Sequence, residues 1–269
     1  MRLPAKRVTP GVVTGYLALS SVPMSFLGEL DPETGRIDNA QSELHGTSVA
    51  HRILTFPEAR GSTVGPYVLY GARKHGVGPL GMIVHHADAI VASAAVLAGI
   101  PCVAGVDVTA LRQGETVTID ADAGYVDVHG VEEIPVVTSI LEDGTGRVLL
   151  LKRSDKVGSF QGLWAGVSGY IEPGVTPRDQ AMTEVREETG IAADALTLRK
   201  EGPVVYARDG ARMFAVHPFL FRVSSPTVTL DWEHTESRWI EPFSLPSFAT
   251  VPRLDRVFRA LGLPSGPKD

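Results

Sequence analysis

Residues 169–191 constrain the fold of this chain most, because they contain the start, the body and the end of one helix. Thr176 has the side chain of an N-cap residue, and Pro177 suits the first helical position. Gly190 is typical of the residue that ends a helix. The stretch therefore predicts a helix over residues 177–189.

Three glutamates share one face of this predicted helix. Glu184, Glu187 and Glu188 stand at the spacing that makes side chains neighbours on a helix surface. Like charges in one patch raise the pKa of each carboxyl unless cations lie among them. Carboxylate oxygens select Mg²⁺ or Mn²⁺, and these ions favour phosphates as further ligands. The alternative is a solvated acidic helix face, which is common in soluble proteins.

The surrounding residues favour the metal site, because the stretch resembles the Nudix box. That motif is a glycine, five residues, a glutamate, seven residues, and then Arg-Glu-aliphatic-x-Glu-Glu-x-Gly-aliphatic. The residues that match it are Gly169, Glu184, Val185, Glu187, Glu188, Gly190 and Ile191. Trp164 and Glu172 also stand where the family usually has a tryptophan and a glutamate, and the resemblance covers residues 133–269.

The resemblance implies a Mg²⁺- or Mn²⁺-dependent hydrolase that cleaves a diphosphate bond. It implies that Glu187 and Glu188 hold metal, and that Glu184 holds metal or takes the proton from water. The backbone carbonyl of Ser168 is a further ligand by the same resemblance.

Other candidate residues lie outside the box. A carboxylate from a distal loop often joins the family's metal site, and Glu233 and Glu236 are the candidates here. We expect Glu236 to contact substrate, although Glu233 also fits a plain surface charge. Arg153, Arg212 and Tyr206 are candidates for substrate contact, and each is equally compatible with a solvated side chain.

Two positions of the box depart from the family pattern, and Val167-Ser168 stands where the family usually has Pro-Gly before the box. Val175 stands at the first box glutamate, and Thr183 stands at the box arginine. In the family this arginine orients the first helix glutamate, so Thr183 puts the geometry of Glu184 in question. The alternative to an active, divergent site is therefore a domain that binds a phosphorylated ligand without hydrolysing it.

The rest of the chain predicts further strands and helices. In the first half we expect strands over 12–19, 48–54 and 80–85, helices over 65–75 and 88–98, and a hairpin of 116–120 with 125–128. In the second half we expect a hairpin of 135–141 with 148–152, a strand over 213–223, a helix over 251–261 and a frayed tail from 264 to 269.

Three blocks of the first half occur in a recognisable order. They are residues 23–35, residues 56–63, and residues 89–103 with their Gly99-Ile100-Pro101 sequence. Together they resemble the aconitase X swivel domain over about residues 9–128. In that family the domain forms the small subunit of archaeal phosphomevalonate dehydratase, or part of related hydroxyproline dehydratases. It closes over a large subunit that carries the iron–sulfur cysteines.

The Arg60-Gly61-Ser62 loop is the candidate substrate site of this first half. Ser62 matches the family's active-site serine, and a Gly-Ser loop suits an anion through its N–H groups and hydroxyl. A tight structural turn is the alternative. Cys102 is the single cysteine, so this chain cannot build an iron–sulfur cluster alone. Dehydration would need an aconitase X-like large subunit as partner.

The composition of the chain gives no sign of a nucleic-acid or membrane partner. The chain has 269 residues with 25 basic and 31 acidic side chains, which suggests about two domains and gives no basic excess for nucleic acid. Its longest apolar stretch, residues 89–100, is too short to cross a bilayer. We therefore expect a cytoplasmic protein with no nucleic-acid or membrane partner, and a homodimer stays open.

The sequence thus predicts two α/β domains: a swivelling β/β/α domain over residues 1–130, and a Nudix α/β/α sandwich with a mixed sheet over residues 133–269. The expected substrate is a small organic or nucleoside diphosphate derivative. An isoprenoid diphosphate is one candidate, because phosphomevalonate dehydratase makes a precursor of isopentenyl phosphate. The alternative is a non-hydrolytic regulatory or small subunit of a dehydratase.

Overall fold

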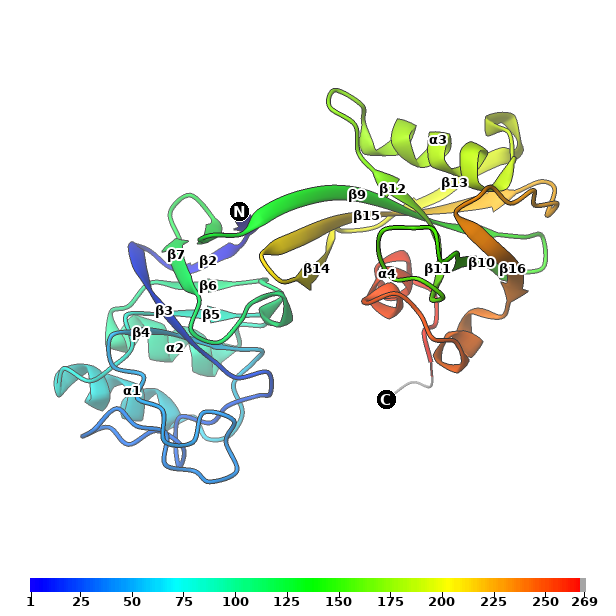
Figure 1. Cartoon of the computed structure of the whole chain (residues 1–269). Coiled ribbons are helices and arrows are strands. Elements are labelled where there is room, and N and C mark those ends of the chain that lie inside the picture. The colour runs from blue at the N-terminus through cyan, green and yellow to red at the C-terminus, as the bar shows by residue number, and fades with distance from the viewer. Residues whose placement is uncertain (267–269) are drawn as a thin grey trace. The chain divides into compact units, whose positions relative to one another are not determined.

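The computed structural model describes residues 1–266. The chain divides into two compact units, Met1–Glu132 and Glu133–Asp269 (Figure 1). Each unit contains one eight-stranded sheet with helices packed on it. The predicted fold class, two α/β domains with mixed sheets, is confirmed.

The first unit places its helices over the parallel centre of its sheet. The strands β3, β4, β5 and β6 are parallel neighbours, and the sheet order is β1-β8-β7-β3-β4-β5-β6-β2. Both helices contribute to one hydrophobic core (Figure 1). The elements are β1 Arg2–Pro4, β2 Lys6–Thr9, β3 Val12–Leu19, β4 Arg52–Phe56, α1 Gly65–Lys74, β5 Gly81–Val84, α2 Ala89–Ala98, β6 Cys102–Ala104, β7 Thr116–Asp120 and β8 Tyr125–Val128.

The bounds predicted from the sequence agree with most of these elements. The strand β3 and the β7–β8 hairpin have the predicted bounds. Asp88 caps α2, because its carboxylate accepts a hydrogen bond from the Val91 N–H at 2.9 Å. The strand expected over 48–54 begins only at Arg52, since His51 has a φ of 58° and interrupts extended backbone.

The second unit is a sheet covered on both faces. Buried residues of α3 pack into one core and those of α4 into another, and Figure 1 shows the two helices on opposite sides. The sheet order is β11-β10-β9-β15-β13, with β12 on β9, β14 on β15 and β16 on β10. The elements are β9 Glu132–Glu142, β10 Val148–Arg153, β11 Trp164–Ala165, β12 Val167–Tyr170, α3 Pro177–Thr189, β13 Leu196–Glu201, β14 Val205–Asp209, β15 Arg212–Val223, β16 His234–Ile240 and α4 Leu254–Leu261.

The carboxylate helix α3 forms with the predicted bounds and caps. The Thr176 hydroxyl accepts the Asp179 N–H at 3.2 Å, and Gly190 ends the helix with a φ of 70°. By contrast, the helix expected from residue 251 begins at Leu254, because Arg253 adopts a φ of 69°. Of the tail expected to fray, residues 267–269 lie outside the described part of the chain.

The predicted turn between β9 and β10 is held by one buried carboxylate. Asp143 accepts hydrogen bonds from the N–H groups of Thr145 and Arg147 and from the Arg147 guanidinium. Burial alone would raise the pKa of Asp143, but hydrogen bonds from the Thr145 hydroxyl, from the two N–H groups and from the Arg147 guanidinium outweigh it and hold the pKa at about 2. This turn fixes the register with which β10 enters the sheet.

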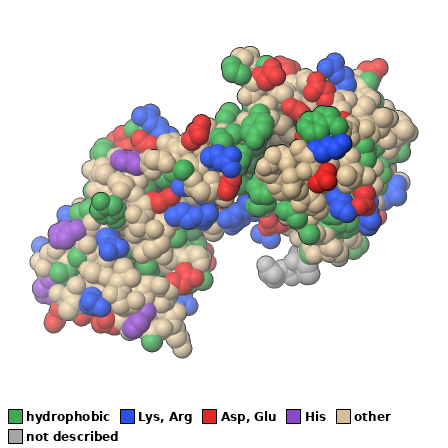
Figure 2. Space-filling model, in the orientation of Figure 1, with side chains coloured by type: hydrophobic (Ala, Val, Ile, Leu, Met, Phe, Trp, Pro, Cys, Tyr) green, Lys and Arg blue, Asp and Glu red, His purple; other side chains and the backbone are tan. Residues whose placement is uncertain are grey.

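The surface carries both signs of charge. Figure 2 shows basic and acidic side chains interspersed over the visible face of each unit, as the modest net charge of −6 suggests. Within residues 1–266, no helix is long and apolar enough to span a bilayer.

Candidate functional site

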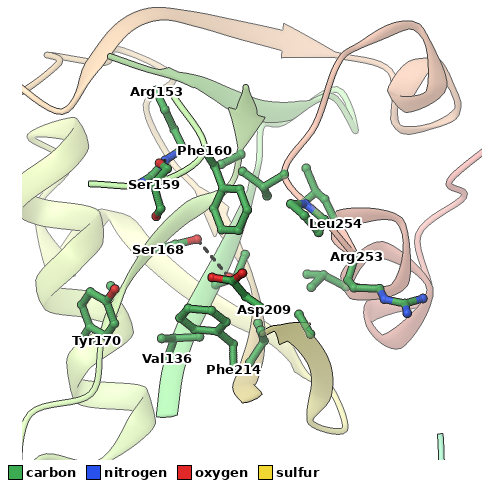
Figure 3. A pocket seen from close by; sticks show the side chains of 18 of the residues that line it. Val136, Arg153, Ser159, Phe160, Ser168, Tyr170, Asp209, Phe214, Arg253 and Leu254 are labelled. Carbon is green, nitrogen blue, oxygen red and sulfur yellow. Dashed lines mark hydrogen bonds between the residues drawn. The ribbon is translucent and has the colours of Figure 1, made fainter. Parts of the chain in front are cut away.

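A pocket of about 390 Å³ opens in the second unit between β12, α3, β14 and the start of α4. Figure 3 shows side chains of Phe160, Phe214 and Asp209 directed into it. Its apolar lining consists of Val136, Phe160, Ala165, Phe214, Val216, Val251, Pro252, Leu254 and Val257. Its charged lining consists of Arg153, Glu172, Glu184, Arg208, Asp209, Glu233 and Arg253. The pocket therefore offers a place for an apolar group beside both carboxylates and cations.

Glu184 is seated directly on the backbone of β12. A Cβ added to Gly169 would overlap the Glu184 carboxylate, so only glycine at this position leaves room for the carboxylate where it lies. Gln180, one turn earlier on α3, donates from Nε2 to the same Oε1 at 2.8 Å. The Gln180 Oε1 in turn accepts the Glu172 N–H at 3.3 Å. The box glutamate is thus oriented even though Thr183 replaces the arginine.

Sequence reasoning missed Gln180. The available signal was its position four residues before Glu184, on the same helix face. Burial raises the pKa of Glu184; the Gln180 hydrogen bond opposes this shift, and the negative charges of Glu187, Glu233 and Glu172 add to it. Glu184 is therefore a stronger base than an ordinary exposed glutamate.

Glu188 lies deeper, with an exposed fraction of 4%. Its Oε1 accepts the Ser168 N–H at 3.2 Å, while its Oε2 is buried and has no hydrogen-bond partner. Burial raises its pKa well above the ordinary value, and the charges of Glu184, Asp231 and Glu233 add to that shift. A buried carboxylate oxygen without a donor is costly unless a proton or a cation joins it.

The structure brings only part of the predicted set together. Ser168, Glu184 and Arg153 line the pocket, and Arg153 donates from Nε to the Ser159 carbonyl at 3.1 Å. Glu187 is outside the lining, with 60% of its side chain exposed and Arg186 at 3.8 Å.

Of the two distal-loop candidates, Glu233 and Glu236, only the first lies at the pocket. Glu233 lines the pocket, whereas Glu236 does not, because its carboxylate pairs with the Lys152 Nζ at 2.6 Å. Arg212 pairs with the lining residue Asp209, and Tyr206 lies outside the lining. The roles assigned to these residues from sequence stay predictions.

The donor set fits a hard divalent cation. Among residues 1–266, no three His, Cys, Asp or Glu side chains already surround one point. However, the unpartnered Glu188 Oε2 and the adjacent Glu184 carboxylate are oxygen donors of the kind that Mg²⁺ and Mn²⁺ prefer. Negative charge concentrated around a buried oxygen is the electrostatic condition for binding such an ion.

The Arg60-Gly61-Ser62 loop of the first unit is tied to residues 25–29. Arg60 pairs at 3.0 Å with Glu29, which is 4% exposed. Gly61 has a φ of 100°, and a Cβ there would lie 2.7 Å from the Ser25 Oγ. Ser62 stands just before α1, where its hydroxyl accepts the Val64 N–H at 3.3 Å. The loop is a fixed turn, and its contact with an anion stays a prediction.

Comparisons with known families agree with this division. Residues 2–128 match the family described as aconitase X swivel domain, and residues 133–261 match the NUDIX domain. The chain is similar to "phosphomevalonate dehydratase small subunit" of Thermococcus gammatolerans, with 48% identity over 48% of this chain and 98% of the relative. The same named protein of Methanocaldococcus jannaschii is 38% identical over 48% of this chain and 98% of the relative.

Solved structures resemble each unit separately. Thermococcus kodakaraensis aconitase X in its holo-form is 43% identical, covers 48% of this chain and 98% of its own, and has a TM-score of 0.47. The MutT protein from Methanosarcina mazei Go1 is 23% identical, covers 48% of this chain and 95% of its own, and has a TM-score of 0.42. The chain belongs to the aconitase X swivel family through its first unit, and its second unit is a Nudix domain.

Proposed function

We propose that the second unit is a Mg²⁺- or Mn²⁺-dependent hydrolase that cleaves the diphosphate bond of a small organic or nucleoside diphosphate derivative. The observation that carries this proposal is the position of Glu184. Its carboxylate lies on the Gly169 backbone in the wall of the pocket, and Gln180 holds it there. The departure at Thr183 therefore leaves the central carboxylate of the box in an ordered place.

The buried and half-buried carboxylates support distinct roles. Glu188 would hold the cation, with the Ser168 carbonyl as a further ligand, and Glu184 would act on the water. A bound divalent ion neutralises phosphate charge and lowers the pKa of water. Glu184 is placed to take a proton from the attacking water, because its carboxylate lines the pocket and is held in place by Gln180. Arg153 lines the same pocket and supplies positive charge for a phosphate group.

The lining also supports a substrate class. A cavity of about 390 Å³ with Phe160, Phe214 and Leu254 in its wall suits a compact apolar or aromatic group. An isoprenoid diphosphate fits this description. The relatives of the first unit are named phosphomevalonate dehydratase small subunit, which makes such a substrate the first to test. We place this activity in the cytoplasm.

The test is phosphate and monophosphate release by the full chain with Mg²⁺ or Mn²⁺. The substrates are isopentenyl diphosphate, geranyl diphosphate, ADP-ribose, a nucleotide sugar and nucleoside triphosphates. We expect metal-dependent turnover that Glu184→Gln abolishes and that Glu201→Gln, an exposed carboxylate change on β13, leaves intact. Turnover of nucleotide sugars without turnover of isoprenoid diphosphates would exclude the isoprenoid assignment.

A second candidate function concerns the first unit. Its 48% identity to a dehydratase small subunit, over 98% of that relative, favours docking to a separate large subunit. Ser62 would then contact substrate at the joined site, while the Nudix unit senses a phosphorylated ligand or acts independently. Dehydration that requires a cysteine-rich partner and is lost in Ser62→Ala would support this role. No turnover in the hydrolysis panel, with ligand binding retained, would make it the main function.

A further inference from the structure

A buried histidine lies beside the carboxylate helix and has no place in the Nudix box. His234 begins β16, and 1% of its side chain is exposed. Its Nε2 is 3.6 Å from the Glu188 Oε2, and its Nδ1 is 2.9 Å from the Asp231 Oδ1. The imidazole therefore lies between two carboxylates, one of which is the buried glutamate of the candidate metal site.

The hydrogen bonds of Asp231 determine which ring nitrogen carries a proton. Its Oδ1 accepts the Glu233 N–H at 3.1 Å and also faces the His234 Nδ1. A carboxylate oxygen is an acceptor, so Nδ1 is the donor of this pair. In a neutral imidazole, Nε2 then holds a lone pair on the side of Glu188.

Unless a proton or a cation lies between them, these two buried atoms that face one another are both acceptors. The Glu188 Oε2 has no hydrogen-bond partner, and 3.6 Å exceeds hydrogen-bond distance. The charges of Glu184, Asp231 and Glu233 also act on Glu188. A cation shared by the two facing atoms would remove their repulsion and balance these carboxylates.

The backbone directs His234 towards this place. The pairing of β16 with β10 shifts between Lys152 and Arg153, which leaves Thr235 as the extra residue of a β-bulge. Bulges change the direction in which a neighbouring side chain points. The segment is also fixed on its other side, because the Ser154 N–H donates to the Glu233 carbonyl at 2.7 Å.

We propose that the His234 Nε2 is a ligand of the divalent metal held by Glu188, and that Asp231 is the residue that orients the ring. Ligands about 2.1 Å from a common ion lie about 3.0 Å apart at a right angle and about 3.4 Å apart in a tetrahedron. A movement of a few tenths of an ångström thus brings both atoms onto one ion. A ligating histidine characteristically donates its other N–H to a carboxylate, as His234 does.

An imidazole ligand changes which metal the site selects. Nitrogen ligands favour Mn²⁺ and Co²⁺ over Mg²⁺, so we expect the two transition metals to bind more tightly. This inference rests on the metal site of the proposed hydrolase, since both use Glu188. It can nevertheless be tested without turnover.

The experiment uses the full chain with Mn²⁺ alone and measures nitrogen coupling to the metal by pulsed electron paramagnetic resonance. We expect imidazole coupling in the unaltered protein. His234→Gln should remove the coupling and weaken Mn²⁺ binding by about 10- to 100-fold, and Asp231→Asn should weaken binding by about tenfold with the coupling retained. His217→Gln, a change at a half-buried histidine of β15, is the matched control and should alter neither quantity.

The outcomes separate this inference from the proposed function. Metal-dependent hydrolysis with bound Mn²⁺ but no imidazole coupling overturns the inference and leaves the hydrolase standing; His234 is then only a charge partner of Glu188. Imidazole coupling without hydrolysis supports the ligand and contradicts the hydrolase. Failure of Mn²⁺ to bind contradicts both. If the buried His234→Gln variant does not fold, absence of imidazole coupling in the unaltered protein still overturns the inference, and weaker Mn²⁺ binding by Asp231→Asn, with the coupling retained, still supports it.

Discussion

The two units hold their candidate functional residues in opposite surroundings. In the second unit, Glu184 lines a pocket and Glu188 is buried, and burial raises the pKa of each. In the first unit, Arg60 is 58% exposed, and the buried member of the pair is its anchor Glu29. A pocket removes water from a ligand by itself, whereas an exposed loop needs a second surface to do so. This contrast favours a site in the second unit that needs no other protein, and a site in the first unit that a partner surface would complete.

A glycine permits close approach in both units, with different consequences. Gly61 uses a φ of 100° and lies against Ser25, so it shapes the loop itself. Gly169 has ordinary strand geometry, and its missing side chain makes room for the carboxylate of Glu184. Gly61 allows the backbone of its loop to turn, whereas Gly169 leaves space for the Glu184 side chain. Four predictions test the difference between the two units, and they run from the largest expected effect on hydrolysis to the smallest.

The largest effect should come from Glu184→Gln, which removes the base while keeping an oxygen for the Gln180 amide. We expect diphosphate hydrolysis to fall by about 10²- to 10⁴-fold. Ser62→Ala should leave the same rate unchanged, because its loop belongs to the other unit. Steady-state kinetics on both variants provide the test. A tenfold loss in Ser62→Ala would show that the units do not work separately.

Gly169→Ala should have the next largest effect. The new methyl group would displace the Glu184 carboxylate, which is the far end of a flexible side chain, so we expect about a 10- to 100-fold lower kcat with little change in stability. Gly158→Ala is the matched control, since nothing lies within 4 Å of its added Cβ. Gly61→Ala should destabilise the first unit and spare hydrolysis. Equal kcat values for Gly169→Ala and Gly158→Ala would contradict the seating of Glu184.

Gln180→Leu should lower kcat by about tenfold, because Gln180 is a positioning residue that acts through Glu184. Thr183→Ala, at the position of the family's arginine, should change kcat less than twofold. We expect Gln180→Asn to lower kcat as well, since the shorter asparagine side chain does not reach the Glu184 carboxylate. A pH–rate profile distinguishes a positioning role from a folding role. The hydrogen bond from Gln180 lowers the Glu184 pKa, so losing this bond should raise that pKa and move the acid limb of the profile to higher pH. An unchanged profile would reduce Gln180 to a packing role.

The smallest effect on hydrolysis should come from Asp143→Ala, which acts on stability. Loss of the turn's hydrogen bonds should cost about 1–3 kcal/mol in the second unit alone. Because the folded pKa of about 2 lies below the ordinary 3.8, the carboxylate stabilises the fold above about pH 4 and loses this effect as pH falls towards 2. Thermal unfolding across pH measures it. Glu29→Ala should shift only the first unit's transition, and a shift of both transitions by either variant would indicate coupled units.

Sequence determined the elements whose signals are local. The helix over residues 177–189 followed from Thr176, Pro177 and Gly190, and its caps formed as expected. The hairpin at Asp143 followed from turn residues between two apolar runs. These features depend on neighbours within one or two turns of the chain, so their chemistry can be read directly. The two family resemblances were carried by motifs of the same kind.

Only the tertiary structure decided which carboxylates meet. Helix spacing placed Glu184, Glu187 and Glu188 on one face, but packing on the sheet buried Glu188, seated Glu184 on Gly169 and left Glu187 exposed. Distances between segments far apart in the chain brought His234 to Glu188 and paired Glu236 with Lys152 instead of the pocket. Local patterns cannot encode such contacts, because strand order and register set them across the sheet.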